Sequence, residues 1–282
     1  MSTLQLNGAN IDYQVEGQGP LLILIPGANG TGDIFSLVRD ELKEQFTVVT
    51  YDRRGFGKST LTEPLPESCK NPYDDYRVKR DAQDINELAS CLSDEPVYIL
   101  GTSSGAIVAM HVLKHYPQIV KDIAFHEPPI NTFLPNATYW KKKNEEIVDD
   151  MLNKGLEEGM KTFSNKNNAS SDDLNILAKA TSQDEASQKR RYEEKLFWAE
   201  YEIRQYTHSD ITLDDLAKHP SQILLLTGED STETFVYKVT RYIAENIDID
   251  LTKMPGGHFG YVQQPQQFSE VLIQTWLSES NQ

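Results

Sequence analysis

The chain has 282 residues, of which 38% are hydrophobic and 25% charged, so it is long enough to bury a full core as one or two domains. Its 27 basic and 43 acidic residues leave a formal net charge of −16, which repels phosphate backbones and anionic membrane surfaces. These values disfavour a disordered chain and a nucleic-acid partner and favour a neutral or cationic small molecule, although a local cleft can differ in sign.

The N-terminal residues and the cysteines bear on the compartment. No basic stretch followed by an apolar core opens the chain, and no apolar run reaches the about 18 residues that a membrane span needs. Cys69 and Cys91 form no CxxC pair and have no neighbouring His cluster, which disfavours a disulfide framework and a zinc site. We therefore expect a cytoplasmic protein with no membrane span.

Short apolar runs alternate with helical patterns over most of the chain. Residues 4–15 alternate apolar and polar side chains, as expected for a half-buried strand. The later runs are apolar on both faces, which is typical of strands inside a parallel sheet. They lie at residues 21–25, 46–51, 97–100, 123–125 and 223–226; a last strand-like run lies at residues 247–254, and helical patterns lie at residues 80–92 and 106–116. The order predicts an α/β fold with a mostly parallel central sheet flanked by helices.

The alternation stops between residues 131 and 212, where no buried strand is visible. Amphipathic stretches at 147–163 and 192–206 predict a helical insertion, and the polar run NKNNASSDD at 165–173 predicts an exposed loop within it. We therefore expect a core domain made of residues 1–130 and 213–282, with residues 131–212 as an inserted lid.

A Gly-x-Ser-x-Gly pentapeptide, Gly101 to Gly105, lies between an apolar strand and a helical pattern. This is the sequence form of a nucleophile elbow, in which a sharp strand-to-helix turn exposes the central serine. Ser103 is then the candidate nucleophile, and Ser104 supplies a backbone N–H to an oxyanion hole. The alternative is a plain turn whose serines cap the helix.

Two further segments support the catalytic interpretation. The loop IPGANG follows the first buried strand, and Ala28 within it is the candidate second oxyanion donor; the alternative is a flexible turn. In MPGGHFG, His258 lies between glycines in a loop near the C-terminus, a position unsuited to core packing. The segment DRRGFGKS is interpreted as structural, with Arg54 as a hydrogen-bond donor.

The order of strand, glycine loop, DRRGFGKS, GTSSG, helical insertion and GGH resembles the α/β-hydrolase superfamily over essentially the whole chain. Within it, IPGANGTGDIF, DYRVKRDAQDI and HEPPINTFLP resemble the bacterial fluorophosphonate-binding serine hydrolases, which are carboxylesterase-like. The resemblance implies a Ser-His-acid triad, a lid after the sixth strand and acyl transfer to water. It makes Ser103 the nucleophile, His258 the base, and the N–H groups of Ala28 and Ser104 the oxyanion hole.

The acid of the triad has two candidates. Most members of the superfamily carry it in a Gly-x-x-Asp segment after the seventh strand, but here Asp230 stands one position early in GEDS. Glu127 follows the apolar run 123–125, at the carboxyl end of a strand, where open α/β sheets place functional groups. We prefer Glu127; the alternatives are a turn-bonding carboxylate for Glu127 and a solvated loop or cap for Asp230.

The expected reaction is hydrolysis of a small ester or acyl substrate through an acyl-enzyme, with no metal or organic cofactor. Thioesterase, lactonase and C–C bond hydrolase activities use the same triad, and a non-catalytic ligand-binding member of the fold is a further alternative. The lid's aromatic residues line an acyl pocket or form the lid's own core, and an exposed apolar lid face predicts a homodimer. Those aromatic residues are Phe133, Trp140, Phe197, Trp198 and Tyr201.

Overall fold

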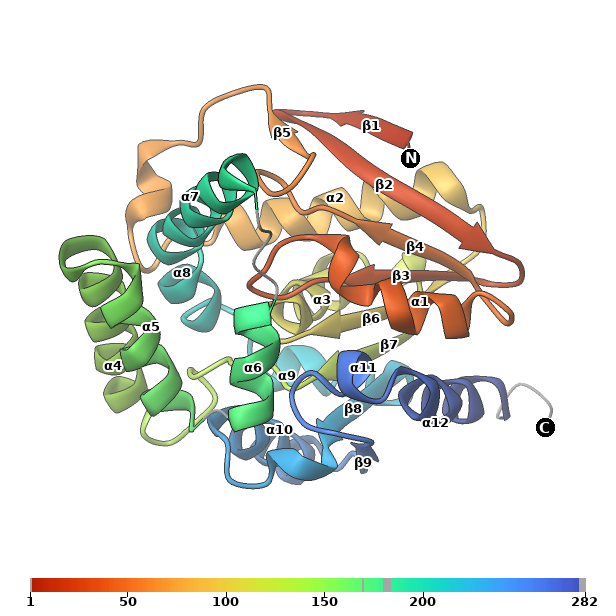
Figure 1. Ribbon diagram of the computed structural model, residues 1–282. Coiled ribbons are helices and arrows are strands. Elements are labelled where there is room, and N and C mark those ends of the chain that lie inside the picture. The colour runs from red at the N-terminus through yellow and green to blue at the C-terminus, as the bar shows by residue number, and fades with distance from the viewer. Residues whose placement is uncertain (1, 169, 180–183, 279–282) are drawn as a thin grey trace.

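The computed structural model describes residues 2–168, 170–179 and 184–278, and within them nine strands form one sheet (Figure 1). Their order is β1-β2-β4-β3-β6-β7-β8-β9, with β5 paired to β2. From β4 to β9 all neighbours are parallel, whereas β1, β2 and β5 pair antiparallel. The strands are β1 (Ser2–Leu6), β2 (Ala9–Gly17), β3 (Leu21–Ile25), β4 (Thr47–Tyr51), β5 (Thr60–Leu61), β6 (Val97–Thr102), β7 (Val120–His126), β8 (Ile223–Gly228) and β9 (Leu251–Met254). The predicted mostly parallel α/β sheet is confirmed.

Helices cover both faces of the sheet. On one face α1 (Ser36–Leu42), α11 (Gly260–Gln263) and α12 (Pro265–Ser278) pack together, and on the other lie α2 (Tyr76–Leu92), α3 (Ser104–His115), α9 (Leu213–Leu216) and α10 (Phe235–Ile247) (Figure 1). Alternate side chains of β3 enter different cores: Ile23 packs on the α3 side, and Leu22 and Leu24 pack on the α12 side. Burial on both faces explains why the strand reads as an unbroken apolar run.

The last strand begins later than the pattern at residues 247–254 predicted. Helix α10 continues to Ile247, and Asp248 ends it in the left-handed conformation, with φ of 55°. Aspartate tolerates this conformation better than most residues because its short side chain bonds locally. The apolar Ile247 and Ile249 therefore belong to a helix end and a turn, and β9 starts at Leu251.

Between β7 and β8 the described residues contain helices and no strand. In chain order they are α4 (Ala137–Asp149), a π-helical turn (Asp150–Lys154), α5 (Leu156–Asn167), α6 (Ser171–Lys179), α7 (Glu185–Tyr201), α8 (Ile203–Thr207) and α9. In Figure 1 the helices α4 to α7 lie to one side of the sheet and in front of it. A separate apolar cluster, which includes Ile147, Met151 and Trp198, joins α4, the π turn and α7. We call residues 131–212 the inserted segment.

The exposed loop predicted at residues 165–173 is wrong at both ends. Helix α5 runs to Asn167 and α6 begins at Ser171, while residue 169 lies outside the described residues. Asp173 is only 3% exposed, because its carboxylate accepts hydrogen bonds from the backbone N–H of Phe259 and from Gln263. The polar composition predicts solvent exposure, which holds for residues 165, 168, 171 and 172, whereas Asp173 finds its partners inside the protein.

No helix in the described part of the chain is long and apolar enough to cross a bilayer.

Candidate active site

The turn between β6 and α3 is strained at Ser103. This residue has φ of 54° and ψ of −127°, in a region that non-glycine residues rarely adopt. The neighbouring strand holds it there, because the Ser103 N–H donates to the carbonyl oxygen of His126 over 2.9 Å. Its own carbonyl accepts the N–H of Ala106 over 2.9 Å, which starts the helix. The Ser103 side chain lines the large cavity described below.

The two glycines of the pentapeptide allow this close approach. A Cβ atom on Gly101 would stand 2.5 Å from the carbonyl oxygen of Gly105, and one on Gly105 would stand 2.4 Å from the carbonyl oxygen of Ile25. Both distances are far below van der Waals contact, and both obstacles are backbone atoms. Only glycine therefore fits at either position while β3, β6 and α3 keep their spacing.

Glu127 directly follows β7 and is fully buried, with a φ of 50°. Its Oε2 lies 2.6 Å from Nδ1 of His258. Its Oε1 accepts hydrogen bonds from Thr227 Oγ1 over 2.8 Å and from the Gly228 N–H over 2.9 Å. Burial by itself raises the pKa of this carboxyl, but the hydrogen bond and charge of His258 lower it to about 2. Glu127 is therefore a carboxylate at neutral pH.

The imidazole of His258 lies between this carboxylate and the cavity. Burial lowers the pKa of His258, but the hydrogen bond and charge of Glu127, together with the charge of Asp173, raise it above its ordinary value. Behind it, the fully buried His126 ring stacks at 6.0 Å between centroids. Burial lowers the pKa of His126 to about 4, so this second ring is neutral at pH 7 and packs as an aromatic group.

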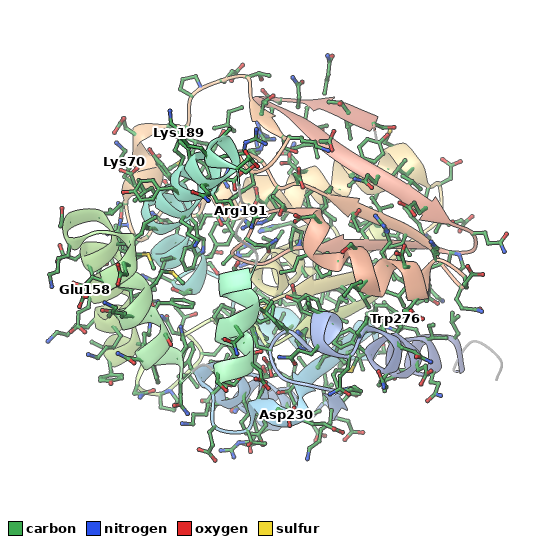
Figure 2. The ribbon with its side chains drawn as sticks, in the orientation of Figure 1. Lys70, Glu158, Lys189, Arg191, Asp230 and Trp276 are labelled. Carbon is green, nitrogen blue, oxygen red and sulfur yellow. The ribbon has the colours of Figure 1, made fainter. Side chains whose placement is uncertain are left out.

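Asp230, the other candidate acid, lies apart from this arrangement. It belongs to the short helical turn Glu229–Ser231 and is exposed, and Figure 2 shows it at the lower surface of the molecule. Its backbone N–H donates to the carbonyl oxygen of Gly256 over 3.0 Å. The carboxylate that hydrogen-bonds His258 in the structure is that of Glu127.

The two candidate oxyanion donors, Ala28 and Ser104, come from the loop after β3 and the start of α3. Ser104 is the first residue of α3, where a backbone N–H has no acceptor within the helix. Ala28 lies in the loop after β3, which is closed by a hydrogen bond from the Gly30 N–H to the Gly27 carbonyl oxygen over 3.0 Å. Arg53 donates to the same Gly27 oxygen over 2.9 Å and so helps to fix the loop. Ala28 and Ser104 both line the cavity that Ser103 and His258 line.

This cavity has a volume of about 820 Å³ and lies between the carboxyl edge of the sheet and the inserted segment. The sequence analysis left open whether the segment's aromatic residues line a pocket or form a core, and the structure shows both. Trp198 lines the cavity, whereas Phe133 belongs to the main core and Phe197 packs edge-on against Phe56. The apolar lining includes Met160, Phe163, Ile176, Trp198, Phe235 and Val262.

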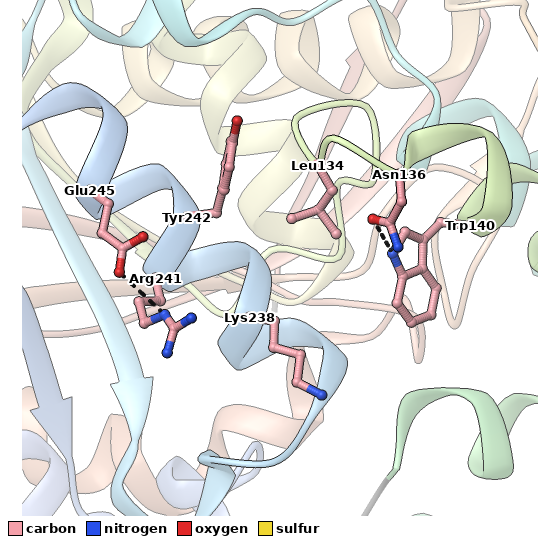
Figure 3. Close-up of a pocket in the computed structure, with 7 residues that line it drawn as sticks. All are labelled: Leu134, Asn136, Trp140, Lys238, Arg241, Tyr242 and Glu245. Carbon is pink, nitrogen blue, oxygen red and sulfur yellow. Dashed lines mark hydrogen bonds and ion pairs between the residues drawn. The ribbon is translucent and has the colours of Figure 1, made fainter.

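A second, smaller cavity of about 250 Å³ lies between α4 and α10 (Figure 3). Trp140 lines it, held by a hydrogen bond from its indole N–H to Asn136 Oδ1 over 3.0 Å. The Trp140 ring also contacts Phe235, at 4.2 Å between centroids, and Phe235 lines the large cavity. These two rings therefore form part of the wall between the two cavities.

The comparisons with known proteins agree with the fold. A family model described as the alpha/beta hydrolase fold matches residues 20–249. The chain belongs to the α/β-hydrolase fold family. An uncharacterized hydrolase, YraK, of Bacillus subtilis (strain 168) is 30% identical over 277 residues, which are 96% of this chain and 93% of that protein.

Two further similarities involve this α/β hydrolase. The human serine hydrolase BPHL is 34% identical over 118 residues, which are 41% of this chain and 38% of that one. The structure of an esterase from Exiguobacterium antarcticum superposes with a TM-score of 0.69 at 19% identity, covering 97% of this chain and 98% of that one. At 19% identity, the similarity to the esterase structure shows the fold alone.

Sequence reasoning missed a buried ionic network beneath the site of this α/β hydrolase. Arg53 is fully buried and pairs with Asp81 over 2.9 Å and with Glu202 over 2.7 Å, while Arg77 reaches the other oxygen of Glu202 over 2.6 Å. Because Glu202 belongs to the inserted segment and Arg53 holds the loop of Ala28, the network ties that segment to the loop. The segment DRRGFGKS predicts a structural role with Arg54 as a hydrogen-bond donor, but nothing in it indicates that Arg53 is buried in an ionic network.

Proposed function

We propose that this α/β hydrolase is a serine hydrolase that cleaves carboxylic esters through Ser103, His258 and Glu127. The observation that carries the proposal is the 2.6 Å hydrogen bond between Glu127 and His258 beside a cavity that the strained Ser103 also lines. A buried carboxylate, an imidazole and a serine in one cavity are the three roles that acyl transfer needs. The name of the human relative, a serine hydrolase, supports the same chemistry.

In this mechanism Ser103 Oγ attacks the ester carbonyl carbon while His258 Nε2 accepts its proton. Glu127 bonds Nδ1, which sets the tautomer with Nε2 free to accept and stabilises the imidazolium that forms. The imidazolium then protonates the leaving alkoxide, and an acyl-enzyme remains. Water, deprotonated by the same imidazole, attacks the acyl carbon and releases the carboxylic acid.

The oxyanion of each tetrahedral intermediate lies between the backbone N–H groups of Ala28 and Ser104. In a comparable site, removal of one donor costs about 2.7–4 kcal/mol of transition-state stabilisation. The position of Ser104 at the start of α3 adds the positive end of a helix dipole. The fixed loop of Ala28 keeps its donor in place without reorganisation during the reaction.

The inserted segment acts as the lid in this proposal. Its residues Met160, Phe163 and Trp198 supply an apolar wall facing the catalytic groups. A wall of this kind binds the acyl or alcohol chain and excludes water from the intermediate.

A fluorophosphonate probe tests the proposal, since it phosphonylates only an activated serine. We expect labelling of the wild-type enzyme, none of Ser103→Ala, and near wild-type labelling of the matched neighbour Ser104→Ala, because that variant keeps its backbone N–H. Turnover of p-nitrophenyl butyrate should follow the same order. Equal loss in both variants would show that the nucleophile is misassigned, and unlabelled wild-type protein would favour a non-catalytic binding member of the fold.

A further inference from the structure

Lys166 places an amino group in the wall of the catalytic cavity. It lies on α5, and its side chain lines the same cavity as Ser103 and His258. The Nζ atom lies 5.8 Å from the ring centroids of both Trp140 and Phe235, which are part of the wall described above. A lysine on a wall of aromatic rings keeps only part of the hydration that an ammonium group has on the surface.

The contacts of this ammonium group include no anion in the described part of the chain. Nζ donates a hydrogen bond to Asn144 Oδ1, which is a neutral acceptor. Two charged groups act on its pKa, Lys143 lowering it and Glu146 raising it by less, and these two side chains pair with each other over 2.6 Å. By contrast, Lys161 on the same helix forms an ion pair with Glu157 over 3.1 Å.

Six carboxylates also line the cavity, and hydrogen bonds or ion pairs engage five of them with groups other than Lys166. Asp52 accepts the N–H groups of Gly32 and Lys58, Asp173 accepts those of Phe259 and Gln263, and Glu202 bonds two arginines. Glu194 accepts the N–H of Gly57 and Asp33 accepts the hydroxyl of Thr31; the sixth is Asp12. Burial, with a smaller contribution from Lys143, lowers the pKa of Lys166 to about 7. A partly buried ammonium without an anion beside it is costly, and an anionic ligand would offset that cost.

We propose that Lys166 binds a carboxylate carried by the ester substrate, so that the enzyme prefers anionic esters over neutral ones of the same shape. This inference rests on the proposed function and names its substrate class. The net charge of −16 favours a neutral or cationic substrate, whereas this proposal names an anionic one. The two differ because the charge of one cavity wall need not follow the sum over the surface.

Two matched pairs of esters test the proposal. The first pair carries the charge on the acyl side, as mono-p-nitrophenyl glutarate and its neutral isostere p-nitrophenyl 5-methylhexanoate. The second pair carries it on the alcohol side, as 4-butyryloxybenzoate and 4-isopropylphenyl butyrate. We expect wild-type kcat/KM to favour the anionic ester in one pair by roughly 10- to 100-fold, the range of a charge-assisted hydrogen bond.

Lys166→Met should abolish that preference and leave the neutral esters within about threefold. Lys161→Met, which removes a charge from the same helix outside the cavity, should change neither the anionic preference nor the kcat/KM of the neutral esters. Lys166→Arg, which keeps the charge, should retain the preference. Absence of a preference in both wild-type pairs, or a preference that survives in Lys166→Met, would overturn the inference. Hydrolysis of the neutral esters tests the proposed function separately. If the wild-type enzyme hydrolyses none of these esters, the proposed function is wrong; if it hydrolyses the neutral esters without preferring the anionic ones, only the role of Lys166 is wrong.

Discussion

Replacement of Glu127 by glutamine is the sharpest test of the site, because it removes one charge and keeps the shape. The wild-type carboxylate accepts three hydrogen bonds, from His258, Thr227 and Gly228. A glutamine offers one acceptor oxygen and an NH₂ group that only donates. It can therefore satisfy the pair of donors on Oε1 or the imidazole on Oε2, but not both.

The magnitude follows from the pKa of Glu127, which the site lowers from an ordinary 4.5 to about 2. This lowering of the pKa corresponds to about 3 kcal/mol in favour of the charged over the neutral form. Because the charge of His258 is one cause of this lowering, Glu127→Gln loses the stabilisation mainly in the transition state, where His258 becomes a cation. Loss of the orienting acid in a comparable triad lowers kcat about 10⁴-fold.

The assay is kcat/KM on p-nitrophenyl butyrate for Glu127→Gln and for the matched surface variant Asp230→Asn. We expect a fall of about 10⁴-fold for the first and a change within about threefold for the second, because Asp230 is exposed. Thermal unfolding of both variants separates loss of activity from loss of fold. A large loss in Asp230→Asn with Glu127→Gln within tenfold of wild type would refute the assignment of the acid.

Three further outcomes follow from the structure. Gly105→Ala should lower the free energy of unfolding in urea by about 1–3 kcal/mol, because its Cβ would stand 2.4 Å from a backbone oxygen of Ile25; an unchanged midpoint would contradict the packing described for the turn. Asp173→Asn should lower the pKa of His258, whose charged form Asp173 favours, so the acidic limb of kcat/KM should move to lower pH; a limb that moves up or stays would exclude this coupling. The homodimer stays a prediction, and light scattering that shows only the 32.0 kDa species would exclude it.

The strands and the candidate nucleophile could be predicted from the sequence because their signals are local. The unbroken apolar run at residues 21–25 follows from burial of β3 on both faces, and the pentapeptide follows from the steric needs of one turn. Glu127 was preferred for its place after a strand, and the structure puts it against His258. Parallel strands bring their carboxyl ends to one edge, so position along the chain could predict this contact.

Partners distant in the sequence could not be predicted in this way. Asp173 reaches the backbone of Phe259 across 86 positions, and Arg53 reaches Glu202 across 149. Nothing local distinguishes these charged residues from solvated ones, because burial depends on which elements the fold places beside them. The same holds for Lys166, whose polar neighbours NKNNASSDD suggested an exposed loop.

Backbone strain separates the candidate catalytic residues from ordinary turns. Four non-glycine residues in the described chain have φ near +50°: Ser103, Glu127, Asn168 and Asp248. The last two end helices α5 and α10, and asparagine and aspartate tolerate that conformation.

Ser103 and Glu127 are neither helix-ending residues nor types that tolerate the left-handed conformation. Strain of this kind persists only where the surroundings enforce it. It is enforced here by backbone hydrogen bonds between neighbouring strands, from Ser103 to His126 and from Glu127 to β8. Ser103 lines the cavity that His258 also lines, and Glu127 bonds that histidine, so strain at these two adjacent strand ends is consistent with the fixed site that the proposed acyl transfer requires.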